Sequence, residues 1–261
     1  MAATPATEIL RDYVVVQRAD LERDLPRLDD VESVHRVRTR ARRVRSVLAA
    51  YDELTPRSRL GRDLRWLGRT VGALRDLDII RSRVTGVDLV PHLLDHERAR
   101  ALADARGALA GDRGHHLVRG LTELGRADVW ADLPRLTLAD VAPRVLGAER
   151  ERVLRRDRLA AQAGPDRPSR LHDVRKAAKR LRYAAEPAGH SELAIRAQTV
   201  QDLLGSGNDA ILTAAWLDRA ARAHPAVADA LRAESERQWS EAHLDDAAYT
   251  SAIGALRDTE L

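Results

Sequence analysis

The residues best suited to chemistry are cationic and lie close together in the first fifth of the chain. The segment 34–51 reads VHRVRTRARRVRSVLAAY and holds six arginines, one histidine and no acidic residue. On a helix, which turns by about 100° per residue, these side chains form two stripes. One stripe holds His35, Arg38, Arg42 and Arg45, and the other holds Arg36, Arg40 and Arg43. Such a density of guanidinium groups is suited to an anion with many charges.

The remaining face of the same helix is apolar. It carries Val34, Val37, Ala41, Val44, Leu48 and Tyr51. A helix with this pattern can pack against a core and still present an uninterrupted cationic edge. Like charges three or four residues apart repel each other by a few tenths of a kcal/mol per pair. The segment therefore carries a local electrostatic cost that an anionic partner would relieve.

The same pattern occurs a second time. The segment 171–185 reads LHDVRKAAKRLRYAA and aligns with the first without a gap. In this alignment His172 falls on His35, Arg175 on Arg38, Lys179 on Arg42, Arg180 on Arg43 and Arg182 on Arg45. The apolar residues Val174, Ala178 and Leu181 also recur, and Lys176 and Lys179 are the only lysines of the chain. A repeat separated by about half the chain indicates two structurally related halves.

A second pair of motifs supports this duplication. Residues 69–80 read RTVGALRDLDII, and residues 199–212 read TVQDLLGSGNDAIL. Gly72 and Asp76 correspond to Gly205 and Asp209, each a glycine followed four residues later by an aspartate. Each half is therefore predicted to contain a basic helix and then a helix that ends in G-x-x-(R/N)-D.

With these motifs the chain resembles the CHAD domain (conserved histidine α-helical domain) family. The resemblance rests on VHRVRTRARRVRS, LRWLGRTVGALRDLDII, LHDVRKAAKRLRY and QDLLGSGND, whose spacing spans nearly the whole chain. It implies an all-α fold of two pseudo-symmetric helical bundles around a basic central groove. It also implies that the groove binds inorganic polyphosphate, and that the protein is a binding module and not an enzyme.

The composition agrees with an all-α fold. The chain has 261 residues, with no phenylalanine, no cysteine and 3% aromatic residues, and it is rich in the helix formers alanine, leucine and arginine. Its few β-branched apolar residues recur at helical spacing. We expect one domain over 1–261, with a first half-repeat over about 1–130 and a second over about 131–261.

Helix signals place the elements that carry the two basic segments. Asp29 or Asp30 is predicted to cap the first basic helix, and Ser169 the second. Pro187 follows the second segment closely, so that helix is predicted to be shorter than the first. The glycines near 205 predict separate helices over 193–204 and 208–223.

The distribution of charge is more informative than the net charge of +4. Segment 34–51 carries six cations and no acid, and segment 170–183 carries six cations and one acid, so the rest of the chain is acidic. This predicts one oriented anion site, provided that the two helices face each other. The lack of cysteine, of a secretory signal and of an apolar run long enough for a membrane predicts a cytoplasmic protein, with association with polyphosphate granules as a further expectation.

The predicted ligand residues combine the two stripes with their neighbours. They are His35, Arg38, Arg42, Arg43, Arg45, Arg69, His172, Arg175, Lys176, Lys179, Arg180 and Arg182. Arg65 and Arg75 are secondary candidates. The alternative is that the arginines are solvated and bridge acids such as Asp63, Asp76 and Asp78. That explanation is the commoner one for a single arginine-rich helix, and the duplication of the stripe favours a ligand instead.

No catalytic, metal or cofactor site is predicted. Asp76, Asp78 and Asp209 are expected to cap helices or to hold arginines, although Mg²⁺ binding beside a phosphate is an alternative. Three other functions stay open: a nucleic-acid binder, a Mg²⁺-dependent hydrolase of polyphosphate or phosphate esters, and a scaffold for an acidic partner protein, for example on polyphosphate granules. The scarcity of aromatic side chains disfavours the nucleic-acid binder.

Overall fold

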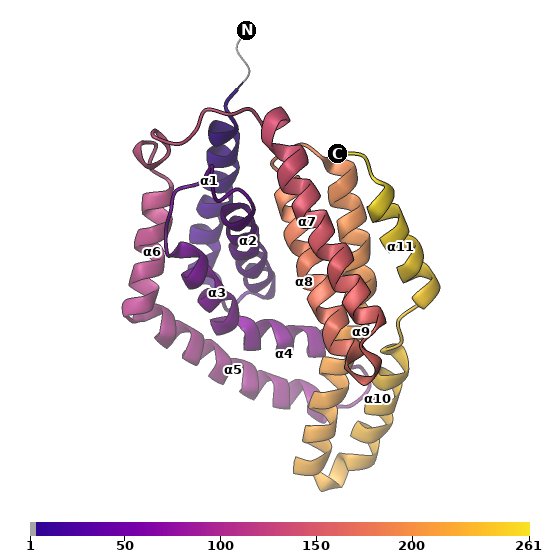
Figure 1. Cartoon of the computed structure of the whole chain (residues 1–261). Coiled ribbons are helices and arrows are strands. Elements are labelled where there is room, and N and C mark those ends of the chain that lie inside the picture. Colours follow the sequence, from indigo (N-terminus) through magenta and orange to yellow (C-terminus); the bar gives the residue numbers. More distant parts are fainter. Residues whose placement is uncertain (1–3) are drawn as a thin grey trace.

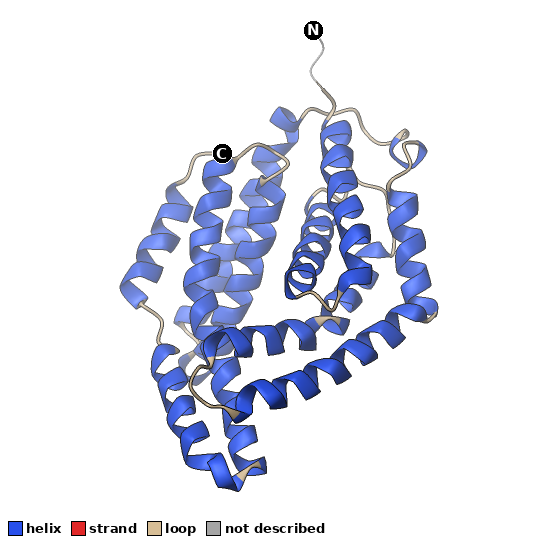
Figure 2. Ribbon diagram, turned by 180° about the vertical axis from the view of Figure 1, so that it is seen from behind, coloured by secondary structure: helices blue, strands red, loops and turns tan. Residues whose placement is uncertain are grey.

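The computed structural model describes residues 4–261, and all regular elements in this range are helices (Figure 2). Besides the helices there is one isolated bridge, between Pro5 and Thr137. The predicted all-α class is therefore confirmed. Within the same residues, no helix combines the length and the apolar character that a membrane span requires.

Eleven α-helices follow one another in the described part of the chain (Figure 1). Those of the first half are α1 (Ala6–Asp24), α2 (Val31–Ala50), α3 (Leu60–Thr70), α4 (Gly72–Arg83), α5 (Leu89–Ala110) and α6 (Asp112–Leu124). Those of the second half are α7 (Leu138–Ala161), α8 (Arg167–Ala185), α9 (Ser191–Ala223), α10 (Ala228–Glu241) and α11 (Asp246–Asp258). The two predicted basic segments are α2 and α8.

The N-termini of these helices match the sequence signals in part. Asp30 caps α2 as predicted, because its carboxylate accepts a 2.8 Å hydrogen bond from the backbone N–H of Ser33. The predicted cap at Ser169 is wrong. Helix α8 begins at Arg167, since a proline in the first turn has no N–H to lose and its fixed φ suits a helix start.

Two further expectations about the second half are also wrong. Helix α8 has 19 residues and α2 has 20, so the second basic helix is not appreciably shorter. The predicted helices 193–204 and 208–223 form one continuous helix of 33 residues, α9. Gly205 lies in its interior, whereas Gly72 begins α4. A glycine costs a helix about 1 kcal/mol, which packing against α8 and α10 outweighs here.

Helices α2 and α8 pack against each other at the centre of the molecule (Figure 1). Around α2 lie α1, α3 and α4, and around α8 lie α7 and α9. The two central helices also satisfy each other's C-terminal carbonyl groups. The guanidinium group of Arg180 donates to the carbonyl of Ala49 at 2.7 Å, and the hydroxyl of Tyr51 donates to the carbonyl of Ala184 at 2.8 Å.

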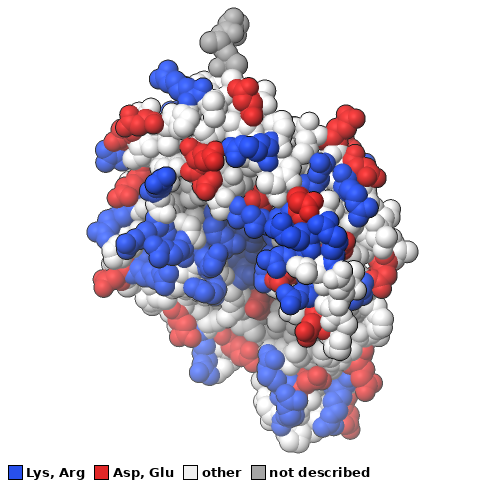
Figure 3. All heavy atoms as spheres, in the orientation of Figure 1, with Lys and Arg blue, Asp and Glu red and all other residues white. Residues whose placement is uncertain are grey.

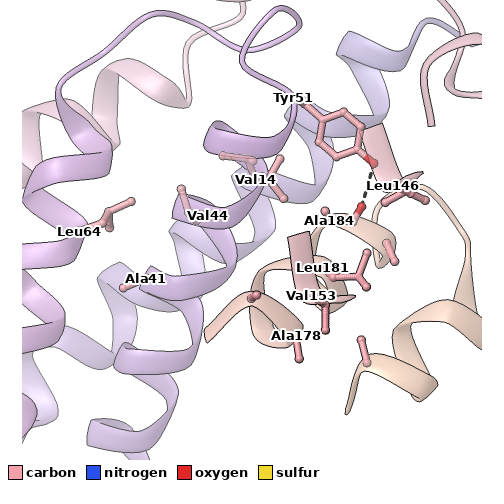
Figure 4. Packing of buried hydrophobic residues seen from close by; sticks show 14 of the residues in the cluster. Val14, Ala41, Val44, Tyr51, Leu64, Leu146, Val153, Ala178, Leu181 and Ala184 are labelled. Carbon is pink, nitrogen blue, oxygen red and sulfur yellow. Dashed lines mark hydrogen bonds between the residues drawn. The ribbon is translucent and has the colours of Figure 1, made fainter. Parts of the chain in front are cut away.

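The core is continuous across the two halves (Figure 4). The apolar face predicted for the first basic segment is buried: the exposed fraction is 0% for Val37 and Val44 and 2% for Ala41. Its counterpart on α8 is buried as well, with Ala178 and Leu181 at 0%. Apolar contacts thus fix the rotation of both helices about their axes, and this rotation decides where the cationic stripes point. The division near residue 130 stays a prediction.

The hydrogen bond of Tyr51 offers a test of this central packing. Tyr51→Phe keeps the ring but leaves the carbonyl of Ala184 without its side-chain donor, and we expect the free energy of unfolding to fall by about 1–2 kcal/mol. Denaturant unfolding measures the change. The matched control is Tyr183→Phe, because the Tyr183 hydroxyl donates no hydrogen bond within residues 4–261. An equal loss of stability in both variants would contradict the capping role.

Candidate anion-binding cavity

A cavity of about 1800 Å³ opens between the two halves of the molecule, and we call it the central cavity. Residues of α2, α3, α4, α7, α8 and α9 line it, among them eighteen Lys and Arg side chains and four Asp side chains. All twelve predicted ligand residues are part of this lining. Figure 3 shows the cations gathered around a hollow in the face of the molecule. The site residues that are far apart in the sequence thus meet at one place.

The two stripes of α2 differ in their partners. Arg36, Arg40 and Arg43 form ion pairs with Asp24, Asp20 and Glu186, each at 2.9 Å. Arg38, Arg42 and Arg45 form no ion pair with any described residue, although all three are half-buried at the cavity wall. Carboxylates of the protein therefore neutralise the stripe of Arg36, Arg40 and Arg43. The stripe of Arg38, Arg42 and Arg45 keeps its positive charge at the cavity wall.

Helix α8 repeats this division. Arg180 pairs with Glu149 at 2.7 Å, Arg182 with Glu186 at 3.4 Å, and Lys176 with Asp173 at 3.2 Å. Arg175 and Lys179 have no carboxylate partner in the described chain. They occupy the positions that align with Arg38 and Arg42. Two unpaired positions are therefore shared by the two basic helices, whereas Arg45 is unpaired and its counterpart Arg182 is paired with Glu186.

Each of these walls is held by a glycine of the following motif. The guanidinium group of Arg38 passes Gly72 so closely that a Cβ atom there would lie 3.1 Å from its Nη1 atom. The same Nη1 donates to the carbonyl of Gly68 at 3.3 Å. A Cβ atom at Gly205 would also lie 3.1 Å from a guanidinium nitrogen, in this case that of Arg175. The glycines give the arginines room to lie across the neighbouring helix.

Arg175 then makes the matching backbone contact. Its Nε atom donates to the carbonyl of Gln201 at 3.4 Å, four residues before Gly205, just as Gly68 lies four residues before Gly72. The glycine motif of each half therefore has the same function: it orients one unpaired arginine of the basic helix. Sequence alone identified the motif but not this contact.

The aspartates of the motifs also reach the cavity. Asp76 and Asp209 both line it, and burial together with the nearby charge of Asp209 raises the pKa of Asp76, against the effect of Arg38. Asp78 lies elsewhere, fully buried and paired with Arg98 at 2.9 Å. Among residues 4–261 no group of three or more His, Cys, Asp or Glu side chains is arranged to hold a metal ion. The arrangement of Asp76 and Asp209 is that of counter-charges to the arginine walls.

The two histidines lie at the cavity wall and are exposed. Partial burial lowers the pKa of His35, and the nearby cations Arg75 and Arg42 lower it further. Partial burial and then Lys176 and Arg175 lower the pKa of His172. An anion bound near these imidazoles would offset the repulsion from the cations and raise both pKa values, which favours protonation.

Lys179 is the most strongly affected cation. Burial lowers its pKa to about 6, and the positive charges of Arg42 and Arg175 act in the same direction. The carboxylate of Asp209 acts in the opposite direction but does not offset these effects. An anion that entered the cavity would stabilise the charged form of Lys179 and raise its pKa.

Sequence analysis missed part of the lining. Arg57 and Arg62 reach the cavity from the α2–α3 loop and α3, and Arg152 and Arg156 reach it from α7. A usable signal was present on α3, where Arg62, Arg65 and Arg69 follow one another at intervals of three and four residues and so share one face. Only Arg69 was among the primary candidates.

The titration of Lys179 is directly measurable because the chain has only two lysines. Lysine labelled with ¹³C at Cε should give two NMR signals, and one of them should titrate with an apparent pKa of about 6. Lys176→Arg removes the other signal and assigns the pair. A midpoint for Lys179 near the ordinary value for lysine would contradict the desolvated, unpaired environment described here.

Comparison with known proteins agrees with this geometry. Residues 15–218 match the CHAD domain family. Two uncharacterised proteins of Mycobacterium tuberculosis, from strains CDC 1551 / Oshkosh and ATCC 25618 / H37Rv, are each 29% identical to the chain over 206 residues. The matches cover 72% of this chain and 40% of each relative, so the chain spans about 40% of the length of the curated relatives that it matches.

Two solved structures share the fold. The crystal structure of the CHAD domain from the plant Ricinus communis is similar at a TM-score of 0.78 and 23% identity, over 99% of this chain and 94% of that one. PptA from Streptomyces chartreusis is similar at a TM-score of 0.69 and 22% identity, over 96% of this chain and 100% of that one. With a family match across most of its length and this shared architecture, the chain belongs to the CHAD domain family.

Proposed function

We propose that the central cavity binds inorganic polyphosphate and that the protein acts by binding and not by turnover. The CHAD family is linked to polyphosphate binding. The observation that carries the proposal is the set of half-buried cations that meet in one cavity without an ion pair in the described chain. On the two basic helices these are Arg38, Arg42, Arg45, Arg175 and Lys179, and Arg75 of α4 and Arg156 of α7 join them.

The chemistry of this set suits a chain of phosphates. A guanidinium group can donate two parallel hydrogen bonds to phosphate oxygens and stays charged at every relevant pH. Arg38 and Arg175 are already oriented by backbone carbonyl groups, so little side-chain freedom remains to be lost on binding. A ligand with one charge on every phosphate can neutralise several of these cations at once.

We further propose that the cavity is the basic groove of two duplicated halves, about 1–130 and 131–261. The support is the repeated contact between an unpaired arginine and a glycine, Arg38 with Gly72 and Arg175 with Gly205, at the same distance of 3.1 Å to the Cβ position. In both halves the arginine also donates to the carbonyl four residues before the glycine. Two contacts of the same kind in the same order favour a duplication over coincidence.

The alternatives have weaker support. Among the described residues, the only aromatic side chain that lines the cavity is Tyr183. It is buried, and the guanidinium groups of Arg43 and Arg182 lie over its ring, at 5.6 and 5.3 Å from the ring centre. It is not free to stack on a nucleobase, as a binder of single-stranded nucleic acid would require. A hydrolase would use Asp76 and Asp209, whose positions beside arginines suit a role in orienting the walls.

We propose cytoplasmic action, with recruitment of a partner protein to polyphosphate granules.

Calorimetric titration with long-chain polyphosphate tests the proposal. The variant with Arg38, Arg42, Arg175 and Lys179 changed to alanine should bind at least about 100-fold more weakly at physiological salt. The negative slope of log K against log[salt] should become shallower by about 3, since each of the four lost phosphate contacts removes about 0.7 from its magnitude. Duplex DNA at equal phosphate concentration should bind far more weakly than polyphosphate to the wild type.

The matched control removes four exposed arginines that lie outside the cavity, Arg100, Arg119, Arg219 and Arg222. It makes the same change in net charge and should retain most of the affinity. Equal binding of DNA and polyphosphate would indicate a nonspecific cationic surface. Release of phosphate in the presence of Mg²⁺ would favour the hydrolase instead.

Polyphosphate binding should also take up protons. Lys179 has a pKa of about 6 without ligand, and a bound anion stabilises its charged form and raises that pKa. Between pH 8 and 6 the complex therefore holds more protons than the free protein, and affinity should rise as pH falls, by up to about tenfold per pH unit for one proton. Titration in buffers of different ionisation enthalpy measures the uptake.

Lys179→Arg is the matched variant for this experiment, because arginine remains charged throughout the range. It should bind as tightly as the wild type at low pH and more tightly at pH 8, with little proton uptake beyond that of the histidines. An uptake as large as that of the wild type would show that Lys179 is not the group that titrates.

A further inference from the structure

The two ends of the central cavity are not equivalent, although the two basic helices repeat each other. We infer that a long polyphosphate chain runs from the centre of the cavity over α3 and does not extend toward Glu186. This inference rests on the proposed function and adds the direction of the ligand and the residues that set it. Three features of the described residues carry it.

The first feature is the arginine face of α3. The glycine contacts align Gly72 with Gly205, and the same alignment places Arg62, Arg65 and Arg69 on Ile195, Gln198 and Asp202 of α9. Arg62, Arg65 and Arg69 are exposed, line the cavity and form no ion pair within residues 4–261. The first half therefore offers three free cations where the second half offers an apolar, a neutral and an acidic side chain.

The second feature is Glu186, at the end of α8. Its carboxylate pairs with Arg43 at 2.9 Å and with Arg182 at 3.4 Å, and it accepts a 2.5 Å hydrogen bond from the hydroxyl of Tyr13. The side chain is only 19% exposed. Glu186 is not itself part of the cavity lining, but as an internal anion it occupies the guanidinium groups of Arg43 and Arg182, which are, and its charge repels a phosphate that approaches them.

The third feature is the residue that aligns with Glu186 in the first half, which is Ala49. Arg45 aligns with Arg182 but has no carboxylate four residues later. Burial lowers the pKa of Arg45, and the nearby cations Arg65 and Arg180 lower it further. Glu149 neutralises Arg180 and Arg152 nearby, and leaves Arg45 unpaired. The excess of positive charge thus lies on the α3 side of the centre.

These features give the ligand a direction. The unpaired cations of α2 and α8 hold the middle of the polyphosphate chain, and α3 adds three further unpaired cations. The other unpaired cations of the lining are Arg57 before α3, Arg75 on α4 and Arg156 on α7. Toward Glu186 the next cations, Arg43 and Arg182, are already neutralised. A phosphate that replaced the carboxylate there would leave Glu186 buried without a partner, which is unfavourable. A short chain fills the centre alone, and a long chain extends over α3.

The first experiment compares tripolyphosphate with long-chain polyphosphate on the variant with Arg62, Arg65 and Arg69 changed to alanine. For the long chain, the magnitude of the negative slope of log K against log[salt] should decrease by about 2, because three contacts are lost. For tripolyphosphate it should change much less. The control variant has Arg100, Arg119 and Arg222 changed to alanine, which are exposed and lie outside the cavity.

The second experiment moves the internal anion. Glu186→Gln keeps an acceptor for Tyr13 but frees two cations. The magnitude of the slope of log K against log[salt] for the long chain should therefore increase by about 1. Ala49→Glu places a carboxylate at an exposed position four residues after Arg45, and the slope should fall by about 1. Thermal unfolding of each variant checks that the fold is retained.

The outcomes separate this inference from the proposed function. If the wild type binds polyphosphate, and the α3 variant and its control lose equally little, the ligand does not run over α3 and the inference is wrong. Weaker binding of long-chain polyphosphate by Glu186→Gln, in a variant that unfolds like the wild type, would also overturn the inference. If the wild type binds neither polyphosphate, the proposed function itself fails.

Discussion

The structure depends on the packing of two helices that each carry many positive charges. α2 and α8 contact each other through apolar faces, and their cations would repel one another if all of them were left uncompensated. The protein divides the charges. Carboxylates from other elements, Asp20, Asp24, Glu149 and Glu186, neutralise the cations that brace the helices. Five half-buried cations of the two helices stay unpaired at the cavity wall, where water, counter-ions or a ligand can approach them.

On the proposed function, the same division of charges would make the cavity more selective for a flexible polyanion than an exposed cationic surface is. Its unpaired cations are half-buried and fixed by the core on one side and by backbone carbonyls on the other, as for Arg38 and Arg175. These cations also repel one another: burial is the main cause of the lowered pKa of Lys179, and the charges of Arg42 and Arg175 lower it further. A ligand that fits gains this repulsion as binding free energy, which an exposed cationic surface does not provide.

The sequence predicted the all-α class and the apolar faces that set the rotation of the two basic helices, because helical periodicity is a local property. A groove shared by the two helices was implied only by the resemblance to the CHAD family, since the residues alone do not show whether the helices face each other. It did not predict which cations are already paired, because Glu149 and Glu186 come from segments whose contacts with α2 and α8 depend on the tertiary fold. The acids that it considered as partners, Asp63 and Asp78, pair with Arg113 and Arg98 instead. Nor did it predict that α9 continues through Gly205, since local propensity ignores the packing on both sides of that helix.

On the proposed duplication, the two halves share the centre of the cavity and differ beyond it. At the centre, the contacts of Arg38 with Gly72 and of Arg175 with Gly205 each orient a wall of the cavity. Positions beyond this centre carry no such constraint, and there the halves differ: Ala49 against Glu186, and the arginines of α3 against the neutral and acidic side chains of α9. A symmetric pair of helices can bind a polymer in either direction, whereas unequal ends place its two directions at different free energies. On the direction that we infer for polyphosphate, this asymmetry gives a chain longer than the cavity a defined exit, which two equal halves would not provide.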